Sequence, residues 1–162
     1  MPRESSLKRV LFDCGTRDAT ASAGLFVLRA SFGLMMLLGH GLSKLRGFQD
    51  MKDGFYVPDF FPFSLMSPPV SLMMTIGAEI GAAGLLVLGL MTRPAAFVLG
   101  FAMVVAAFGK HGVDPWVSIS IDGPSKEMAL LYLFPVLAIL LSGAGGLSLD
   151  AAIHQEKKRQ YW

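Results

Sequence analysis

The sequence predicts an all-α integral membrane protein, a four-helix bundle connected up-down-up-down. Of the 162 residues, 53% are hydrophobic and only 16% are charged, whereas soluble domains carry more charge and fewer apolar residues. The mean hydropathy of +0.55 points the same way. The apolar residues also gather in four runs, each close to the length at which a helix crosses a bilayer. A chain of this length fits a single domain.

The four runs divide the chain into a membrane domain and two polar tails. We expect an N-terminal tail at 1–20, the membrane domain at 21–152 and a basic, aromatic C-terminal tail at 153–162, with spans at about 23–42, 69–90, 94–109 and 126–141. Only Thr92 and Arg93 separate the second span from the third, which predicts a tight antiparallel hairpin. Residues 5–12 of the first tail are compatible with a short interfacial helix.

Two longer connections join the remaining spans. Residues 45–67 mix aromatic residues with charges, and Pro58 and Pro62 prevent a long helix there. Aromatic residues suit the headgroup region, so this connection is either an interfacial anchor or a lid over the mouth of the bundle. Residues 111–125 contain an alternating apolar and polar stretch, 117–121, that is compatible with a short strand.

Four spans place both termini on the same side of the membrane. Outside the spans, more Lys and Arg residues lie in the two tails and the 92–93 turn than in the two longer connections. The positive-inside rule therefore predicts that both termini are cytoplasmic. The chain is expected to be a multi-pass protein in direct contact with the lipid bilayer.

The first span carries charges that a lipid-facing helix would not tolerate. At 100° per residue, five residues share one stripe about 80° wide: Arg29, Gly33, Met36, His40 and Lys44. An ionisable side chain at bilayer depth is unfavourable unless it has a partner or water. We therefore expect this stripe to face partners or a polar pocket inside the bundle.

Glu79 lies close to the middle of the second span. A lone carboxylate at that depth is either protonated or paired with a cation, and Arg29 is the only arginine within a span. The expected Arg29–Glu79 pair has two interpretations. It either specifies how the first two helices dock, or it lines a pocket for a proton-coupled or redox ligand.

Further ionisable residues gather at the span ends opposite the termini. Six of them would form a polar rim at one mouth of the bundle: His40, Lys44, Lys110, His111, Lys126 and Glu127. Together with Arg29 and Glu79 they are the candidate ligand-pocket residues, and none of them is assigned a catalytic role. The His and Glu residues lack the spacing typical of a metal motif, so no metal is expected.

The composition and the motifs exclude several chemistries. Cys14 is the only cysteine, so intramolecular disulfides, CxxC redox pairs and cysteine-based metal clusters are ruled out. The sequence has no nucleophile elbow, phosphate loop, dinucleotide-binding glycine pattern or haem attachment motif. The net charge of +2 does not indicate a nucleic-acid partner.

Seven short motifs occur in an order and spacing that resemble the DoxX family of small four-helix membrane proteins: 28–29, 39–45, 79–81, 89–93, 110–112, 126–133 and 143–150. The resemblance covers residues 22–152. It implies a prokaryotic protein, bacterial or archaeal, of the cell (inner) membrane. Relatives have been linked to quinone-coupled sulfur oxidation and to membrane oxidoreductase complexes that answer thiol or oxidative stress.

Two functions of different classes are open. In the first, the chain is a quinone-associated redox subunit, in which Arg29, His40, Glu79 and Glu127 hydrogen-bond a quinone head group and a partner protein supplies the electrons. The chain then has no intrinsic cofactor, and a quinone is its candidate ligand. In the second, the chain is a non-catalytic subunit that docks or stabilises a larger assembly or a homo-oligomer.

The second function has its own candidate surfaces. Gly77 and Gly81 would let a neighbouring helix approach closely, because both lack a side chain and lie on one helix face. The aromatic stretch 48–63 and the Tyr161–Trp162 end are the other candidate contacts. A small-solute carrier is a third alternative, which four short spans would form only as an oligomer.

Overall fold

The computed structural model describes residues 12–118 and 123–153, and every regular element within them is a helix. The predicted all-α class is confirmed for this part of the chain. Three helices are long and apolar enough to cross a membrane, namely Ala19–Arg46, Pro68–Leu88 and Thr92–Lys110, and a fourth apolar helix, Glu127–Ser142, is shorter. Residues 5–11 of the predicted helix at 5–12, most of the stretch 117–121 and the Tyr161–Trp162 end lie outside the described residues.

Each of the three long helices is a rod in which α-helix is interrupted or ended by a π-helical segment. The first rod consists of α2 (Ala19–Met35), η1 (Met36–Gly41) and α3 (Leu42–Arg46). The second consists of α5 (Pro68–Ile76), η3 (Gly77–Ala82) and α6 (Ala83–Leu88). The third consists of α7 (Thr92–Val104) and η4 (Val105–Lys110). The remaining elements are α4 (Phe48–Met51), the 3-10 turn η2 (Phe63–Leu65), α8 (Glu127–Ser142) and α9 (Leu149–Ile153).

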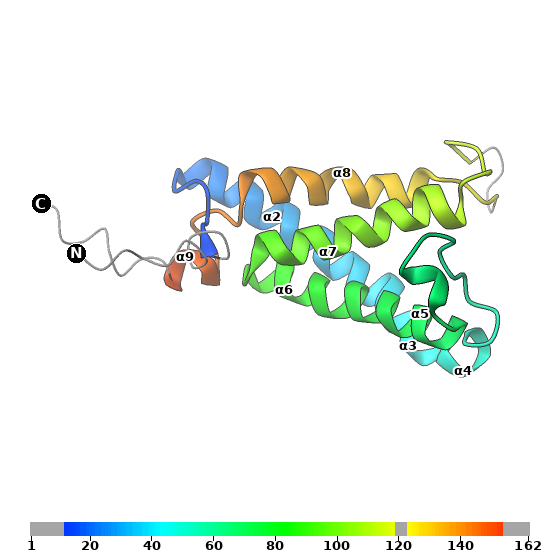
Figure 1. Ribbon diagram of the computed structural model, residues 1–162. Helices are drawn as coiled ribbons and strands as arrows, with labels where there is room; N and C mark the ends of the chain where they lie inside the picture. Colours follow the sequence, from blue (N-terminus) through cyan, green and yellow to red (C-terminus); the bar gives the residue numbers. More distant parts are fainter. Residues whose placement is uncertain (1–11, 119–122, 154–162) are drawn as a thin grey trace, which may run out of the picture.

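The helices lie side by side in a bundle with two different ends (Figure 1). α7 packs along α8 and α6, and α2 packs along α6 and α8. The start of α2, the turn between α6 and α7, the end of α8 and α9 meet at one end, which we call the terminal end (Figure 1). The connection 52–67 and the described residues of the connection 111–126, namely 111–118 and 123–126, lie at the opposite end, which we call the loop end (Figure 1).

The rods approach one another closely at glycines of the first rod. A Cβ on Gly33 would lie 2.8 Å from Val87 Cγ2, and one on Gly41 would lie 2.6 Å from Ile80 Cγ1. Close backbone approach of this kind is how helices gain packing energy in a membrane, where no hydrophobic effect drives them together. Gly77 and Gly81 instead face outward, and no described residue comes within 4 Å of a Cβ built on either. Within this chain, the small-residue face expected at these two positions is therefore not used.

The terminal end is closed by Arg29, which is 1% exposed and does not pair with Glu79. Its Nη1 donates to the carbonyl oxygens of Leu86 at 2.8 Å and Val87 at 2.7 Å. Nε donates to Ala144 O at 3.3 Å, and Nη2 donates to Leu147 O. The last carbonyls of a helix lack intrahelical donors and carry the negative end of its dipole. The expected Arg29–Glu79 pair is thus wrong, because Arg29 caps the C-terminal end of α6.

Asp150 completes this closure from α9. Its carboxylate accepts hydrogen bonds from the Met91 and Thr92 amides, at 2.8 and 2.9 Å, where α7 begins. Gly89 in the same turn has a φ of +67°, and a Cβ there would lie 2.7 Å from Arg29 Cζ. Only glycine satisfies both the left-handed backbone and the contact with the guanidinium group. Asp150 and Gly89, together with Arg29, therefore stabilise the hairpin between the second and third rods.

Candidate functional site

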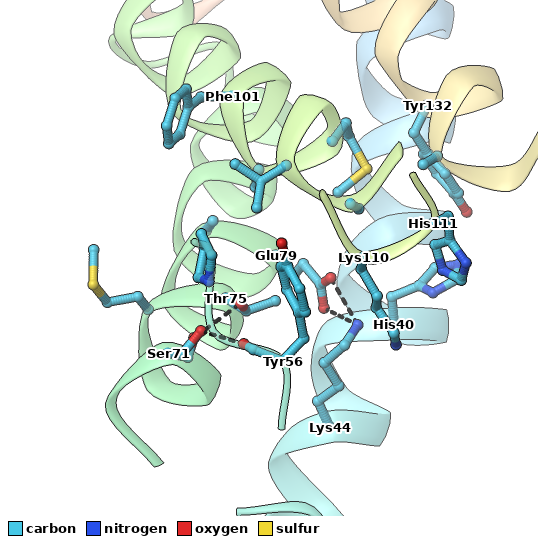
Figure 2. A pocket seen from close by; sticks show the side chains of 18 of the residues that line it. His40, Lys44, Tyr56, Ser71, Thr75, Glu79, Phe101, Lys110, His111 and Tyr132 are labelled. Atoms are coloured by element: carbon cyan, nitrogen blue, oxygen red, sulfur yellow. Dashed lines mark hydrogen bonds and ion pairs between the residues drawn. The ribbon is translucent and has the colours of Figure 1, made fainter. Parts of the chain in front are cut away.

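A cavity of about 440 Å³ lies at the loop end, between the three rods and α8 (Figure 2). Its volume falls within the range of small-molecule sites. Most of its wall is apolar and flexible, with methionine and aromatic side chains such as Met36, Met103 and Phe101. The connection 52–67 contributes a further part of the wall through Tyr56 and Phe63. That connection thus covers the cavity, as the lid interpretation predicts.

Each rod gives the cavity an ionisable side chain from its π-helical segment. His40 comes from η1, Glu79 from η3 and Lys110 from η4, and all three line the cavity. A π-helical turn is less stable than α-helix and occurs frequently at functional sites. Three such turns around one cavity indicate that the backbone has been adapted to present these side chains.

Glu79 is paired with Lys44 at the inner wall of the cavity (Figure 2). Lys44 Nζ lies 2.7 Å from both carboxylate oxygens, and the side chains are 21% and 5% exposed, respectively. Of the two states expected for Glu79, the structure shows the paired one, with a different cation. At 1.5 Å per residue, Arg29 lies on the first rod roughly 16 Å from His40, toward the terminal end. The charge within reach of Glu79 is therefore Lys44.

Three hydrogen-bond donors face the cavity without an acceptor from the described part of the chain. The Tyr132 hydroxyl, on a residue only 5% exposed, has no hydrogen-bond partner there. The His40 ring packs edge-on against Tyr132, with centroids 5.2 Å apart, and makes no hydrogen bond among the described residues. Lys110 Nζ lies 6.0 Å from the Phe55 ring centroid and has no carboxylate partner in the same part. The cavity is therefore rich in donors.

The mouth of the cavity near α8 is held by His111 and the residues that follow it. His111 Nδ1 lies 2.7 Å from Asp114 Oδ2. Lys126 Nζ donates to Gly112 O at 2.9 Å and to Asp114 O at 2.6 Å. Glu127 accepts a hydrogen bond from the Ser118 amide at 3.0 Å. Lys126 and Glu127 thus fix the loop that positions His111, without lining the cavity themselves.

Tyr56 anchors the other side of the mouth. Its carbonyl oxygen accepts a hydrogen bond from Ser71 Oγ at 2.7 Å, and a Cβ on Gly109 would lie 2.7 Å from its hydroxyl. Burial first, and then the charge of Asp59, raises the pKa of Tyr56 above its ordinary value of 10.0. The hydroxyl therefore stays protonated well above neutral pH and remains a donor beside the cavity.

Five of the eight candidate residues line the cavity, namely His40, Lys44, Glu79, Lys110 and His111. Arg29 lies at the terminal end, and Lys126 and Glu127 hold the loop. Tyr132 and Tyr56 were not singled out from the sequence. The signal for Tyr132 is a lone hydroxyl inside an otherwise apolar span. Among the described residues, no cluster of three or more His, Cys, Asp and Glu side chains is arranged to hold a metal ion.

Comparison with known proteins identifies a family and two relatives. The DoxX family profile matches residues 24–112, which include the five candidate residues that line the cavity. One Haemophilus influenzae protein is 28% identical over 153 residues, covering 93% of this chain and 96% of the relative. A second protein of the same organism is 40% identical over 72 residues, covering 44% of this chain and 54% of the relative. Both are described only as uncharacterized proteins, and no solved structure matches the chain.

Proposed function

The chain belongs to the DoxX family of membrane proteins, and from this premise we propose that it is a quinone-associated subunit of a membrane redox complex. The observation that carries the proposal is a set of donors without an acceptor among the described residues, in a largely apolar cavity: Tyr132, His40 and Lys110. Quinone oxygens are hydrogen-bond acceptors only, and the rest of a quinone ring is apolar. The residues that line the cavity therefore fit a quinone head group.

In this proposal the three rods and α8 cross the inner membrane of a prokaryotic cell, with both termini in the cytoplasm. In the sequence, the two tails and the 92–93 turn carry more Lys and Arg than the two longer connections, which supports that orientation. α8 has 16 residues and spans about 24 Å, less than the roughly 30 Å of a typical hydrocarbon core. A small local thinning of the bilayer accommodates such a difference. The cavity then lies near the non-cytoplasmic face.

A bound quinone supplies two-electron, two-proton redox chemistry, and the proposal assigns the electrons to a partner protein. The residues of this chain bind and orient the head group. The Tyr132 hydroxyl and the His40 imidazole donate to its oxygens, and Lys110 adds positive charge from the mouth. A cation beside the quinone oxygens stabilises negative charge on them, and it does so most strongly where water is excluded. Glu79 holds Lys44 at the inner wall.

The proposal is tested by measuring which quinones the protein retains and binds. The full chain is purified in mild detergent, and the menaquinone and ubiquinone extracted from it are quantified by chromatography. The protein is then equilibrated with added menadione, and bound menadione is quantified in the same way. Tyr132→Phe removes one hydroxyl and is expected to weaken menadione binding roughly fivefold, the value of one hydrogen bond. Ser142→Ala removes a hydroxyl that donates to Ala138 O and, within the described residues, to no other group, far from the cavity, and it serves as the matched control. A wild-type protein that retains and binds no quinone would refute the proposal.

The alternative, a non-catalytic subunit that docks a larger assembly, is favoured by one observation. Gly77 and Gly81 lie exposed on the second rod, with nothing within 4 Å of a Cβ on either, so a partner helix has room to approach there. Gly81→Leu is expected to remove a co-purifying partner in native gels while leaving quinone retention unchanged. Loss of quinone without loss of a partner would argue against this alternative.

A further inference from the structure

We infer that the cavity opens sideways between α5 and α7, and that its ligand is a lipid-borne molecule whose apolar tail leaves through this opening into the bilayer. The inference rests on the proposed function, because it takes a quinone as the head group. The ligand is then a long-chain molecule, and it enters through the face of the bundle between α5 and α7.

The second and third rods diverge toward the loop end. They are joined by the short turn at 89–91, and α7 packs against α6 and η3. α5, which continues the second rod beyond η3, is not among the main packing partners of α7, and the two helices separate toward the loop end in Figure 1. The cavity reaches into the gap, where Met74 of α5 and Val98 of α7 form parts of its wall.

The side chains beside this gap are accessible. Four residues line the cavity and keep large exposed fractions: Met74 at 51%, Phe97 at 62%, Val98 at 48% and Phe101 at 39%. All four side chains are apolar, so the opening matches the hydrocarbon of a membrane. A charged or strongly hydrated ligand would lose its hydration on this path, whereas an isoprenoid or alkyl chain would not.

The connection 52–67, which we call the lid, directs the apolar tail of the ligand toward this gap. The rings of Phe60 and Phe63 lie 5.3 Å apart, and each contacts Phe101, at 6.4 and 5.5 Å between centroids. Tyr56 is tied to Ser71 on the same side. These contacts bridge α7 and the second rod above the gap, at the end where water would enter. The donors that hold the head group in the proposal, His40, Lys110 and Tyr132, lie across the cavity from Phe101 (Figure 2). A head group placed on them leaves its tail on the side of the gap.

Two probes with the same ring separate the head group from the tail. Menaquinone-4 carries an isoprenoid chain on the naphthoquinone ring, and menadione carries none. The full-length protein is equilibrated with each probe in detergent micelles, and bound quinone is quantified by chromatography after the free probe is removed. Val98→Trp places a large side chain in the gap. Val104→Trp makes the same change on the same helix, at a position that is 40% exposed and does not line the cavity.

Val98→Trp is expected to weaken menaquinone-4 binding on the order of tenfold, the usual consequence of overfilling a site, and to change menadione binding by less than roughly twofold. Met74→Trp narrows the gap from its other side and is expected to behave in the same way. Val104→Trp is expected to change neither probe. Equal effects of Val98→Trp on both probes, no effect on menaquinone-4, or the same effect from Val104→Trp would each overturn the sideways opening. Wild-type binding of menadione in those cases leaves the proposed function standing, and failure to bind either probe refutes both.

Discussion

Arg29 is a buried cation whose partners are backbone carbonyl oxygens of α6 and of the segment after α8. A guanidinium group has five donors in a fixed fork, which suits several carbonyls at once. Asp150 and Gly89 complete the same cluster. Three of the motifs that resemble the DoxX family, at 28–29, 89–93 and 143–150, therefore meet in one structural joint.

Removing the Arg29 side chain should destabilise the bundle. Arg29→Met leaves several buried carbonyls without donors, which is expected to lower the free energy of unfolding by on the order of 3 kcal/mol. Cys14 provides the measurement, because it is the only cysteine and is 2% exposed at the same end. A thiol-reactive dye then reports the unfolding temperature in detergent. Arg46→Met, at an exposed cation of α3, is the control, and an unchanged midpoint for Arg29→Met would contradict the role of Arg29.

The Lys44–Glu79 pair should behave as a unit. Glu79→Gln leaves Lys44 without its carboxylate, and Lys44→Met leaves Glu79 without its cation, so each is expected to destabilise the protein by roughly 3 kcal/mol. In the double variant, Lys44→Met with Glu79→Gln, no unpaired charge remains and at least half of that loss should be recovered. The dye assay with Cys14 measures all three variants. Losses that simply add would show that the two side chains are not coupled.

At the scale of the helices, periodicity predicted which face turns inward but not which residues meet. The stripe on the first span places Arg29, Gly33 and Met36 inside the bundle, and all three are buried. The partner of Glu79 depends on how far one rod slides along the next, which a single sequence does not specify. The π-helical segments add to this difficulty, because each shifts the faces that a 3.6-residue wheel assumes. Glycines inside or beside these segments, such as Gly39 and Gly109, were the available signal.

The lid should depend on the contact between Tyr56 and η4. Gly109→Ala places a methyl group 2.7 Å from the Tyr56 hydroxyl. This contact is expected to destabilise the closed position of the lid by about 1 kcal/mol. Trypsin cleavage after Lys52, which lies in the lid connection, should then accelerate roughly fivefold in detergent. Tyr56→Ala should have the same effect, and the two changes together no more than either alone. Gly81→Ala, where a methyl group meets nothing, is the control, and cleavage of Gly109→Ala at the wild-type rate would count against the contact.

At the scale of the whole molecule, the two ends of the bundle have opposite characters. The terminal end is closed by Arg29 and Asp150, which satisfy the backbone groups of the turn between α6 and α7. The loop end holds a cavity whose donors lack acceptors in the described part of the chain, and connecting segments cover it. Because the rods are joined at the terminal end, they can diverge at the loop end without sliding past one another. The cavity is therefore a consequence of the architecture rather than a defect in packing.

The orientation of this architecture decides which compartment exchanges protons with the cavity. Both described chain ends lie at the terminal end (Figure 1). The excess of Lys and Arg in the sequence of the two tails and the 92–93 turn predicts that this end faces the cytoplasm. Single cysteines are introduced in a Cys14→Ala background by Ala19→Cys at the terminal end and Asp53→Cys at the loop end, both at exposed positions. A membrane-impermeant maleimide should label Asp53→Cys in spheroplasts and Ala19→Cys only in inverted vesicles. The cavity mouth, beside the His111–Asp114 pair, would then open toward the non-cytoplasmic side. The reverse labelling pattern would place the mouth in the cytoplasm, so that any protons taken up with a bound quinone would come from there.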